Sequence, residues 1–477
     1  MGVWRIRKAL MTAALLPALD RAERLLARME AVPFGRWHRK PRIVIGTATF
    51  FDAFDALSLA FALPVLVMLW DIAPAQIGIL ISASYVGQLI GALVFSSLAE
   101  KHGRIRGATT AVTIMSIMSL GCVFAGNFQM LLLLRFLQGI GIGGHMPVAA
   151  TYISELSRAR GRGRFFLLYE MIFPVGLMIT GQIGRLVVPS LGWQAMFLIG
   201  AVPGLVVAYL ISKLPESPRW LINRGRLDEA ERIIAAMEAR NAYAMSGSAE
   251  EMQPPPPPTP PPSKPAVQAQ VAQKTRWLEL LSPAYLGRSL TVWALWASAY
   301  FIANGLNNWL ATLYRTVYDL DLRTALLAAS LTNVAQVVLL LVCVFTIDRI
   351  GRRNWVAASF VVGGAALGAL GLMWAESVIA LMVLGTLAYG VIGSTNAVLY
   401  LYTPEIYPTR MRAIGTGLAT SWLRLASAVA PTLVGLMVGD QGIAAVFLMF
   451  AAVAVVGLVA ATRMIETSNR RLEDIAQ

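Results

Sequence analysis

The chain has 477 residues, of which 57% are apolar and only 14% are charged. Because soluble domains carry about 25% charged residues, this composition excludes an ordinary soluble enzyme and a disordered chain. One membrane-spanning helix needs about 20 apolar residues, so the apolar content is enough for about twelve such helices. The formal net charge of +14 would suit a nucleic-acid partner, but the positions of the basic residues explain it without one.

The first 42 residues alternate short apolar runs with Arg and Lys. They lack the long apolar core of a cleaved leader, so we expect an amphipathic helix on a membrane surface, with an irregular tail as the alternative. Two sets of six apolar segments follow, separated by one long hydrophilic stretch. They cover residues 43–69, 76–99, 107–126, 130–154, 165–188 and 193–212, then 286–314, 324–347, 354–374, 377–401, 412–438 and 443–462.

This pattern predicts an all-α membrane protein with 12 transmembrane helices in two six-helix bundles. The hydrophilic stretch has a helical pattern at 227–238 and a proline run at 254–262, which is typical of a solvated spacer. A docking site for a partner with an aromatic groove is the alternative. The predicted domains are a cytoplasmic N-terminal segment (1–42), a first bundle (43–212), a cytoplasmic linker (213–285), a second bundle (286–462) and a cytoplasmic tail (463–477).

The basic residues predict the orientation of the chain. If the helices cross alternately, 35 of the 40 Lys and Arg residues fall on one side, and only Arg315 and Arg323 lie in loops on the other. The positive-inside rule then places the linker and both termini in the cytoplasm. We therefore expect a multi-pass protein of the cytoplasmic (inner) membrane with no nucleic-acid partner.

Metal and cofactor chemistry has little support in the sequence. Cys122 and Cys343 both lie in apolar segments, and the three histidines are far apart. These positions predict no disulfide framework and no metal site. A phosphate-binding loop and a nucleophile–base pair are also missing from the sequence, so we expect neither a cofactor nor an enzyme.

The two predicted bundles repeat each other. Gly103 follows the second segment and Gly351 follows the eighth, 248 positions later. Glu155 and Arg162 follow the fourth segment, and the same two residue types recur after the tenth, 250 positions later. Parallel repeats of this kind occur in transporters whose substrate site lies between the two halves.

The repeated charged loops predict a latch, in which glycine turns and acid–arginine pairs close the cytoplasmic face of the two bundles. Ordinary positive-inside charge is the alternative explanation. The residues predicted for the latch are Glu100, Gly103, Arg104, Glu155, Arg162, Asp348, Gly351, Arg352, Glu405 and Arg412.

Several motifs resemble those of the major facilitator superfamily. The loops near Gly103 and Gly351 resemble its Gly-x-x-x-Asp-Arg-x-Gly-Arg-Arg motif, although Glu100 and Ile105 depart from it. Residues 135–141 resemble its Arg-x-x-Gln-Gly-x-Gly motif. The resemblance covers residues 43–462 apart from the proline-rich insert and implies a two-bundle transporter that is a monomer. Signatures of its sugar and organic-ion porters are matched by residues 215–221 and 404–412.

One branch of the superfamily is matched more closely. Residues 51–55 (FDAFD) and 143–151 (GGHMPVAAT) are similar to the niacin and metabolite:proton symporters, which are in turn similar to organic ion transporters. Arg424, followed seven residues later by Pro431, is similar to the eleventh-helix pattern of this branch, with Ala426 where we expect glycine. The resemblance implies a small organic substrate.

Ionisable residues inside the spans are the first candidates for function, because each costs about 2.5–3.5 kcal/mol to insert. Asp52 and Asp55 lie three residues apart and share one helix face. Two close carboxylates suit a site that binds and releases protons, so both are predicted to couple protons to transport; a permanent ion pair with an arginine is the alternative. The superfamily resemblance implies that Arg135 pairs with Asp55 and completes the proton-coupling site.

Three further intramembrane residues are predicted from their chemistry. The planar guanidinium of Arg424 matches a carboxylate, so we expect it to face the substrate. A pair with Asp52, Glu170 or a backbone carbonyl is the alternative. His145 is also assigned to the substrate site, with a proton relay or a structural hydrogen bond as the alternatives. We expect Arg185 to extend toward the membrane surface.

Polar and aromatic residues of the seventh and tenth segments complete the predicted substrate site. A helix break near Gly305 would expose backbone groups for gating, and Tyr389, Asn396 and Tyr400 are spaced to share one face. A plain packing stripe is the alternative. The predicted substrate-binding residues are Arg424, Asn304, Asn308, Trp309, Tyr389, Asn396 and His145.

These observations predict a secondary active transporter for proton-coupled symport of a small organic anion by alternating access. An aromatic carboxylate, such as a nicotinate- or benzoate-like molecule, fits the two arginines best. Transport of an organic cation, sugar or polyol is the alternative. A channel or a membrane-embedded enzyme is a minor alternative, because no repeated filter sequence occurs. The expected partners are the substrate, protons and the lipid bilayer.

Overall fold

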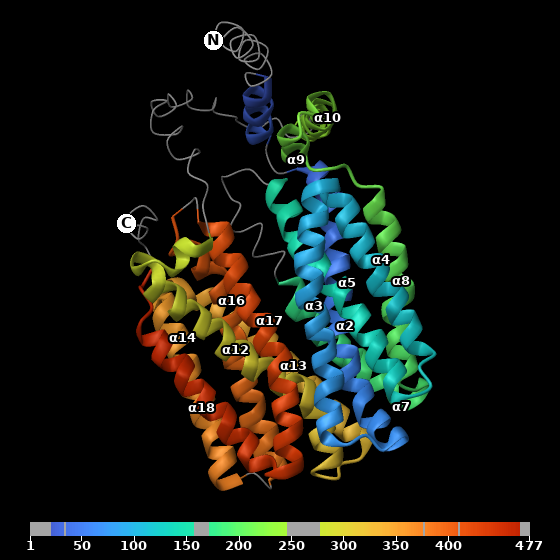
Figure 1. The fold of residues 1–477 in the computed structure, drawn as a ribbon, viewed down its shortest axis with the longest axis vertical. Coiled ribbons are helices and arrows are strands. Elements are labelled where there is room, and N and C mark those ends of the chain that lie inside the picture. The colour runs from blue at the N-terminus through green and yellow to red at the C-terminus, as the bar shows by residue number, and fades with distance from the viewer. Residues whose placement is uncertain are drawn as a thin grey trace, which may run out of the picture.

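The computed structural model describes residues 21–32, 35–156, 171–245, 277–374, 377–408 and 411–467. Within these ranges the regular elements are helices, and no strand occurs. Figure 1 shows two groups of long helices side by side, one from the first half of the chain and one from the second. The predicted all-α, two-bundle membrane fold is therefore confirmed.

The first bundle and the helices after it follow the predicted order. Its members are α2 (Arg36–Trp70), α3 (Pro74–His102), α4 (Arg104–Val123), α5 (Phe128–Glu155), α7 (Ile172–Leu191) and α8 (Gln194–Ser212). The short helices α9 (Pro218–Asn223) and α10 (Leu227–Met245) lie at one end of this bundle (Figure 1). We call this end of the protein the linker face and the opposite end the distal face.

The second bundle begins after the turn η1 (Trp277–Leu281). Its long helices are α12 (Pro283–Thr316), α13 (Leu322–Ile350), α14 (Arg352–Ala369), α16 (Thr386–Glu405), α17 (Arg412–Asp440) and α18 (Ile443–Thr462). A π-helical turn, η2 (Leu370–Trp374), extends α14, and α15 (Val378–Ala380) with η3 (Leu381–Gly385) leads into α16.

Eleven helices of the described chain are long and apolar enough to cross a membrane. The twelfth is α12, which has 34 residues and packs among the other helices of the second bundle. Its asparagines, tryptophans and tyrosines make it less apolar than the others. Such side chains can form hydrogen bonds with neighbouring helices inside the protein.

The two bundles meet in the distal halves of their helices. The Ser82 and Thr432 hydroxyls are 2.7 Å apart across α3 and α17. The Asn308 amide of α12 donates to the Tyr85 hydroxyl of α3 over 3.1 Å. Figure 1 shows the bundles in contact at the end opposite α9 and α10. The structure is thus held closed at the distal face.

Close helix packing explains the glycine-rich stretch of α5. A Cβ atom on Gly139 or Gly143 would collide with the backbone of α3 at Ser84 or Gln88. Small residues allow two helix backbones to approach, which is how membrane helices associate without a hydrophobic driving force. This packing fixes the position of α5, which carries Arg135 and His145, relative to α3.

The N-terminal segment packs on protein in the part that the structure describes. Residues 21–31 are helical, and buried Leu25 and Met29 share an apolar cluster with residues of α10. Arg21 lies 2.6 Å from Glu231 of α10, and hydrogen bonds from Arg21 and Arg28 lower the pKa of Glu231. α10 thus covers the apolar side of this stretch, and its position on a membrane surface stays a prediction.

A partly buried carboxylate caps α4 at the linker face. Glu216 accepts hydrogen bonds from the backbone N–H groups of Arg104 (2.9 Å) and Ile105 (3.2 Å), at the first turn of α4. Burial raises the pKa of Glu216, and these hydrogen bonds oppose the rise. Gly103, with φ 111°, makes the turn before α4, and a Cβ there would collide with the Glu216 carboxylate.

The same cap recurs in the second bundle. Glu466 accepts from the backbone N–H groups of Arg352 (3.0 Å) and Arg353 (3.1 Å), at the first turn of α14. Gly351, with φ 91°, is the matching turn, and Glu466 lies 250 positions after Glu216. The anion at a helix N-terminus is favourable in both copies. The sequence repeat is therefore also a structural repeat, and it includes two acids that were not among the predicted latch residues.

Four of the predicted latch residues, Glu100, Arg104, Glu155 and Glu405, make contacts within their own half of the chain. Arg104 lies 2.9 Å from Glu155 of α5 and 3.0 Å from Glu100 of α3. Glu405 accepts from the Thr467 hydroxyl over 2.6 Å. A latch between the bundles stays a prediction. Arg162 and the side chains of Asp348 and Arg412 lie outside the described structure.

Replacing a capping acid should destabilise the fold. In Glu216→Ala or Glu466→Ala, the backbone N–H groups at the first turn of α4 or α14 lose their carboxylate acceptor, at a cost of about 1–3 kcal/mol. We expect a lower midpoint of thermal unfolding for each purified variant than for Glu229→Ala. The control removes an exposed acid paired with Arg226. Equal midpoints for the Glu216 and Glu229 variants would contradict the capping role.

Candidate functional site

Asp55 lies at the centre of the first bundle and is fully buried on α2. Its Oδ1 atom accepts a hydrogen bond from the Ser119 hydroxyl of α4 over 3.0 Å. Gly200 of α8 packs directly against this carboxylate, since a Cβ atom there would collide with it. The second oxygen, Oδ2, is buried and makes no hydrogen bond in the described structure. The carboxyl group is therefore held in place with one oxygen free to take a proton.

Arg135 of α5 contacts the same turn of α2. Its Nη1 atom donates to the backbone carbonyl of Asp55 over 3.2 Å and to the Gln138 side chain over 2.6 Å. The guanidinium lies 5.9 Å from the centre of the Phe197 ring. The structure thus brings the predicted pair together, although Arg135 donates to the Asp55 backbone carbonyl and not to its carboxylate.

Asp52 and His145 form a second buried pair, one helical turn away. Asp52 Oδ2 lies 2.5 Å from His145 Nδ1, and both side chains are fully buried. Asp52 Oδ1 and His145 Nε2 make no hydrogen bond in the described structure. The structure therefore joins His145 to Asp52, and its predicted contact with substrate stays a prediction.

Arg424 of α17 has no such acid partner. It is partly buried, and its Nη1 atom donates to the Thr420 carbonyl of its own helix over 3.3 Å. No carboxylate of the described residues forms an ion pair with it. Of the alternatives for Arg424, the structure thus shows the backbone carbonyl and not Asp52; Glu170 lies outside the described residues.

An aromatic cluster lies beside Arg424. The ring of Trp296 stacks on Tyr300 at 5.5 Å and meets Tyr400 edge-on at 4.6 Å. Both tyrosines lie near the Arg424 guanidinium. Trp296 is fixed by a 2.9 Å hydrogen bond from its Nε1 to the Thr403 hydroxyl. α12, α16 and α17 together place aromatic rings next to a guanidinium.

The asparagines of α12 bind neighbouring helices. Asn304 donates to the Ser427 hydroxyl of α17 over 2.6 Å, and Trp309 donates to the Pro431 carbonyl over 3.2 Å. α12 continues through Gly305 without the break considered there. Gly305 instead lets the Phe450 ring of α18 pack closely. Asn308 contributes to the bundle contact described above.

Tyr389 and Asn396 of α16 have different surroundings. The Tyr389 hydroxyl lies 2.7 Å from Gln336 and 3.3 Å from Asn333, two buried amides of α13. Asn396 is partly buried, and its Oδ1 atom is buried without a hydrogen-bond partner in the described structure. Their roles in substrate binding stay predictions.

Sequence reasoning missed several partners of the predicted residues. Each missed residue is a polar or aromatic residue in an apolar helix. That contrast with the surrounding sequence could have identified it as a candidate. The pairing depends on helix packing, which single-sequence patterns do not give. These residues are Ser119, Gln138, Trp296, Tyr300, Asn333 and Gln336.

The arrangement separates two kinds of chemistry. The first bundle holds buried acids that can bind and release protons, next to a fixed arginine and a histidine. The second bundle holds a guanidinium without an acid partner beside aromatic rings and amides. Among the described residues, no group of three or more His, Cys, Asp or Glu side chains comes together to hold a metal ion.

Comparison with known proteins agrees with this arrangement. The profile of the sugar (and other) transporter family matches residues 50–477. The niacin transporter NiaP of Acinetobacter baylyi is 34% identical over 460 residues, which cover 94% of this chain and 99% of that protein. The 4-hydroxybenzoate transporter PcaK of Pseudomonas aeruginosa is 27% identical, covering 87% of this chain and 88% of that one.

Solved structures share the fold. The xylose transporter XylE from E. coli, in a partially occluded inward open conformation, aligns with a TM-score of 0.71 and 17% identity, covering 92% of this chain and 100% of that chain. The family match spans most of the chain, and the niacin transporter is similar over nearly its whole length. The chain therefore belongs to the sugar (and other) transporter family of the major facilitator superfamily.

Proposed function

We propose that this protein is a secondary active transporter that moves a small organic anion together with protons. The substrate class we favour is an aromatic carboxylate of the nicotinate or benzoate type. The observation that carries the proposal is Arg424, a guanidinium without an acid partner among the described residues, beside the aromatic rings of Trp296, Tyr300 and Tyr400.

The chemistry of the residues around Arg424 suits a flat anion. A guanidinium offers parallel N–H donors that match the two oxygens of a carboxylate. Aromatic side chains stack on flat rings, and tyrosine adds a hydroxyl that can bind a ring substituent. A substrate carboxylate would supply the negatively charged partner that Arg424 lacks among the described residues. The names of the niacin and 4-hydroxybenzoate transporters support this substrate class.

Proton coupling is assigned to the first bundle. Asp55 would bind a proton at the oxygen that makes no hydrogen bond, which removes the negative charge beside Arg135. Arg135 lies on α5 and donates hydrogen bonds to the backbone of α2 and to Gln138 of α5, so these contacts would change with the charge of Asp55. Asp52 and His145 would share a proton across the same two helices. Each event would alter how α2 packs on α5.

Alternating access follows from the bundle contacts. The distribution of basic residues supports a cytoplasmic linker face and an outer distal face. With the distal face closed, the structure would represent an inward-facing state. Rocking of the two bundles about the central site would expose Arg424 to the other side. We assign the protein to the cytoplasmic membrane with both termini inside.

An organic cation is the second candidate. If Asp52 and Asp55 stay ionised in the substrate-bound state, the cavity would favour a positive charge. Organic cation/carnitine transporter 7 of Arabidopsis thaliana is 27% identical over 93% of this chain. The second bundle argues against it, because Arg424 would repel a cation near the aromatic cluster.

Asp55→Asn should uncouple transport from the proton gradient. Asparagine keeps the shape of the side chain but cannot bind a proton reversibly. In vesicles containing the purified variant, uptake should no longer follow an imposed pH gradient, while exchange of labelled for unlabelled substrate should persist. Asp440→Asn, at an exposed position near the distal end of α17, is the matched control and should retain coupling. Uptake by Asp55→Asn that still follows the gradient would reject Asp55.

Arg424→Gln should weaken binding of aromatic carboxylates. Loss of a charge-assisted hydrogen bond costs about 1.5–3 kcal/mol, equivalent to about a 10- to 100-fold higher Kd. Arg424→Lys keeps the charge but loses the planar fork, so its Kd should be intermediate. Nicotinate and 4-hydroxybenzoate are the probes for calorimetry on the purified protein.

Arg349→Gln is the control for Arg424→Gln, because it removes an exposed arginine at the linker end of α13. Its Kd should equal that of the unmodified protein. Binding of organic cations but not of aromatic acids by the unmodified protein would overturn the anion proposal and favour the second candidate.

A further inference from the structure

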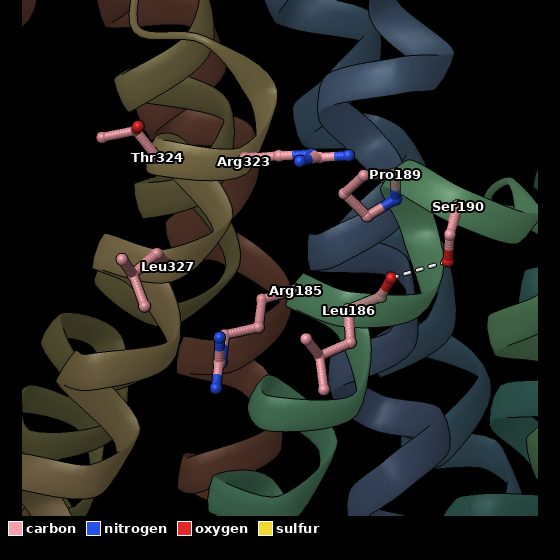
Figure 2. Close-up of a pocket in the computed structure, with 7 residues that line it drawn as sticks. All are labelled: Arg185, Leu186, Pro189, Ser190, Arg323, Thr324 and Leu327. Atoms are coloured by element: carbon pink, nitrogen blue, oxygen red, sulfur yellow. Dashed lines mark hydrogen bonds between the residues drawn. The ribbon is translucent and has the colours of Figure 1, made fainter.

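A cavity of about 340 Å³ lies between the two bundles, near the distal face. It is formed by the last turns of α7 and the first turns of α13, which belong to different bundles. Figure 2 shows that the Arg323 side chain extends from α13 toward Pro189 of α7. Arg185 lies on the side of α7 that faces α13. The cavity thus brings two arginines together away from the proposed substrate site.

Neither arginine has an acid partner in the described structure. Arg185 donates from Nε to the Gln182 side chain over 2.7 Å, which leaves its charge uncompensated. Arg323 is exposed and makes no ion pair with a described residue. Asp321 is two residues away, but its carboxylate accepts the Thr324 N–H over 3.1 Å and caps α13. Two like charges in one cavity repel, so an anion bound there would be favourable.

The distal face is otherwise poor in positive charge. Arg315 and Arg323 are the only basic residues of the loops predicted on this side. Arg315 already donates to the Leu320 carbonyl over 2.9 Å and contacts the Met68 sulfur at 3.4 Å. The cavity therefore holds a local concentration of positive charge on a face that carries little elsewhere.

The surroundings of the arginines match a lipid. Leu186 is 60% exposed and Leu327 is 41% exposed, and both line the cavity. Arg185 lies six residues before the end of α7, about 9 Å from it along the helix axis. This depth places the guanidinium near the boundary between the apolar core and the headgroups of one leaflet. The hydroxyls of Ser190 and Thr324 add polar groups at the cavity.

We propose that this cavity is a binding site for the phosphate of an anionic phospholipid, which bridges α7 and α13 at the distal face. The guanidinium groups of Arg185 and Arg323 bind the phosphate oxygens, and the acyl chains lie along Leu186 and Leu327. A headgroup without its own cation is preferred, because the site supplies two positive charges and no unpaired acid. Phosphatidylglycerol meets this condition, whereas phosphatidylethanolamine carries a compensating ammonium.

The position of the site gives the lipid a conformational effect. The Gln182 amide of α7 donates to the Ser330 carbonyl of α13 over 3.5 Å, close to the cavity. These two helices belong to different bundles, and opening of the distal face would separate them. A lipid that binds both would stabilise the closed distal face. A ligand shifts a conformational equilibrium only by its different affinity for the two states.

Native mass spectrometry of the delipidated full-length protein tests the site. With phosphatidylglycerol, phosphatidylethanolamine and phosphatidylcholine added in turn, the unmodified protein should bind phosphatidylglycerol most tightly. Arg185→Gln and Arg323→Gln should each raise the Kd for phosphatidylglycerol about tenfold, as expected for loss of a charge-assisted hydrogen bond. Arg315→Gln removes one positive charge from the same face outside the cavity and should leave the Kd unchanged.

A second measurement reports the conformational effect. Spin labels placed on the distal ends of α7 and α13 should show a larger closed fraction in phosphatidylglycerol nanodiscs than in phosphatidylcholine nanodiscs. This difference should vanish in the Arg185→Gln/Arg323→Gln double variant, whose folding is checked by its thermal unfolding midpoint. Both measurements are independent of the transport proposal, since neither uses substrate.

Three results would overturn the proposal. The first is equal affinity of the unmodified protein for the three lipids. The second is an unchanged Kd for phosphatidylglycerol in both single variants. The third is displacement of bound phosphatidylglycerol by millimolar inorganic phosphate or nicotinate, which would identify the cavity as a site for small soluble anions.

Discussion

Burial of charge in a membrane is the constraint on which the structure depends. Each ionised side chain placed at the centre of a bilayer costs about 2.5–3.5 kcal/mol unless the protein supplies partners. The first bundle meets this cost by pairing: Asp55 with Ser119, Asp52 with His145, and Arg135 with Gln138 and the α2 backbone. α2 and α5 must therefore pack closely, and the glycines of α5 allow α3 to pack closely on its other side.

The two bundles share the same helix arrangement and helix caps, but they differ in the polar residues inside the membrane spans. Glu216 and Glu466, which are 250 positions apart, cap equivalent helices, so the repeat includes the linker face. The membrane interior has diverged, with acids and Arg135 in the first bundle and an aromatic cluster with Arg424 in the second. Such a division suits a coupled transporter, because proton binding and substrate binding can then act on different halves of one central site.

Much of the fold could be predicted from the sequence because membrane insertion is a local problem. Twenty apolar residues span the bilayer whatever their neighbours are, and the basic loops indicate orientation. Local patterns do not show which neighbouring helix a residue contacts. Gly305 lies within a continuous α12 and lets the Phe450 ring pack closely, which the sequence around the glycine does not indicate. Likewise, the apolar side of residues 21–31 packs on α10, a contact that the spacing of its apolar residues cannot specify.

The sequence by itself determined the membrane class, the duplicated halves and the identity of the ionisable residues inside the spans. Their partners were decided only by the tertiary structure, since residues such as Asp52 and His145 are 93 positions apart and meet through helix packing. The same holds for Arg424 beside Trp296, Tyr300 and Tyr400, and for Arg185 with Arg323 in one cavity. Hydropathy and charge are properties of each residue alone, whereas a pair or a cavity exists only once distant helices are in contact.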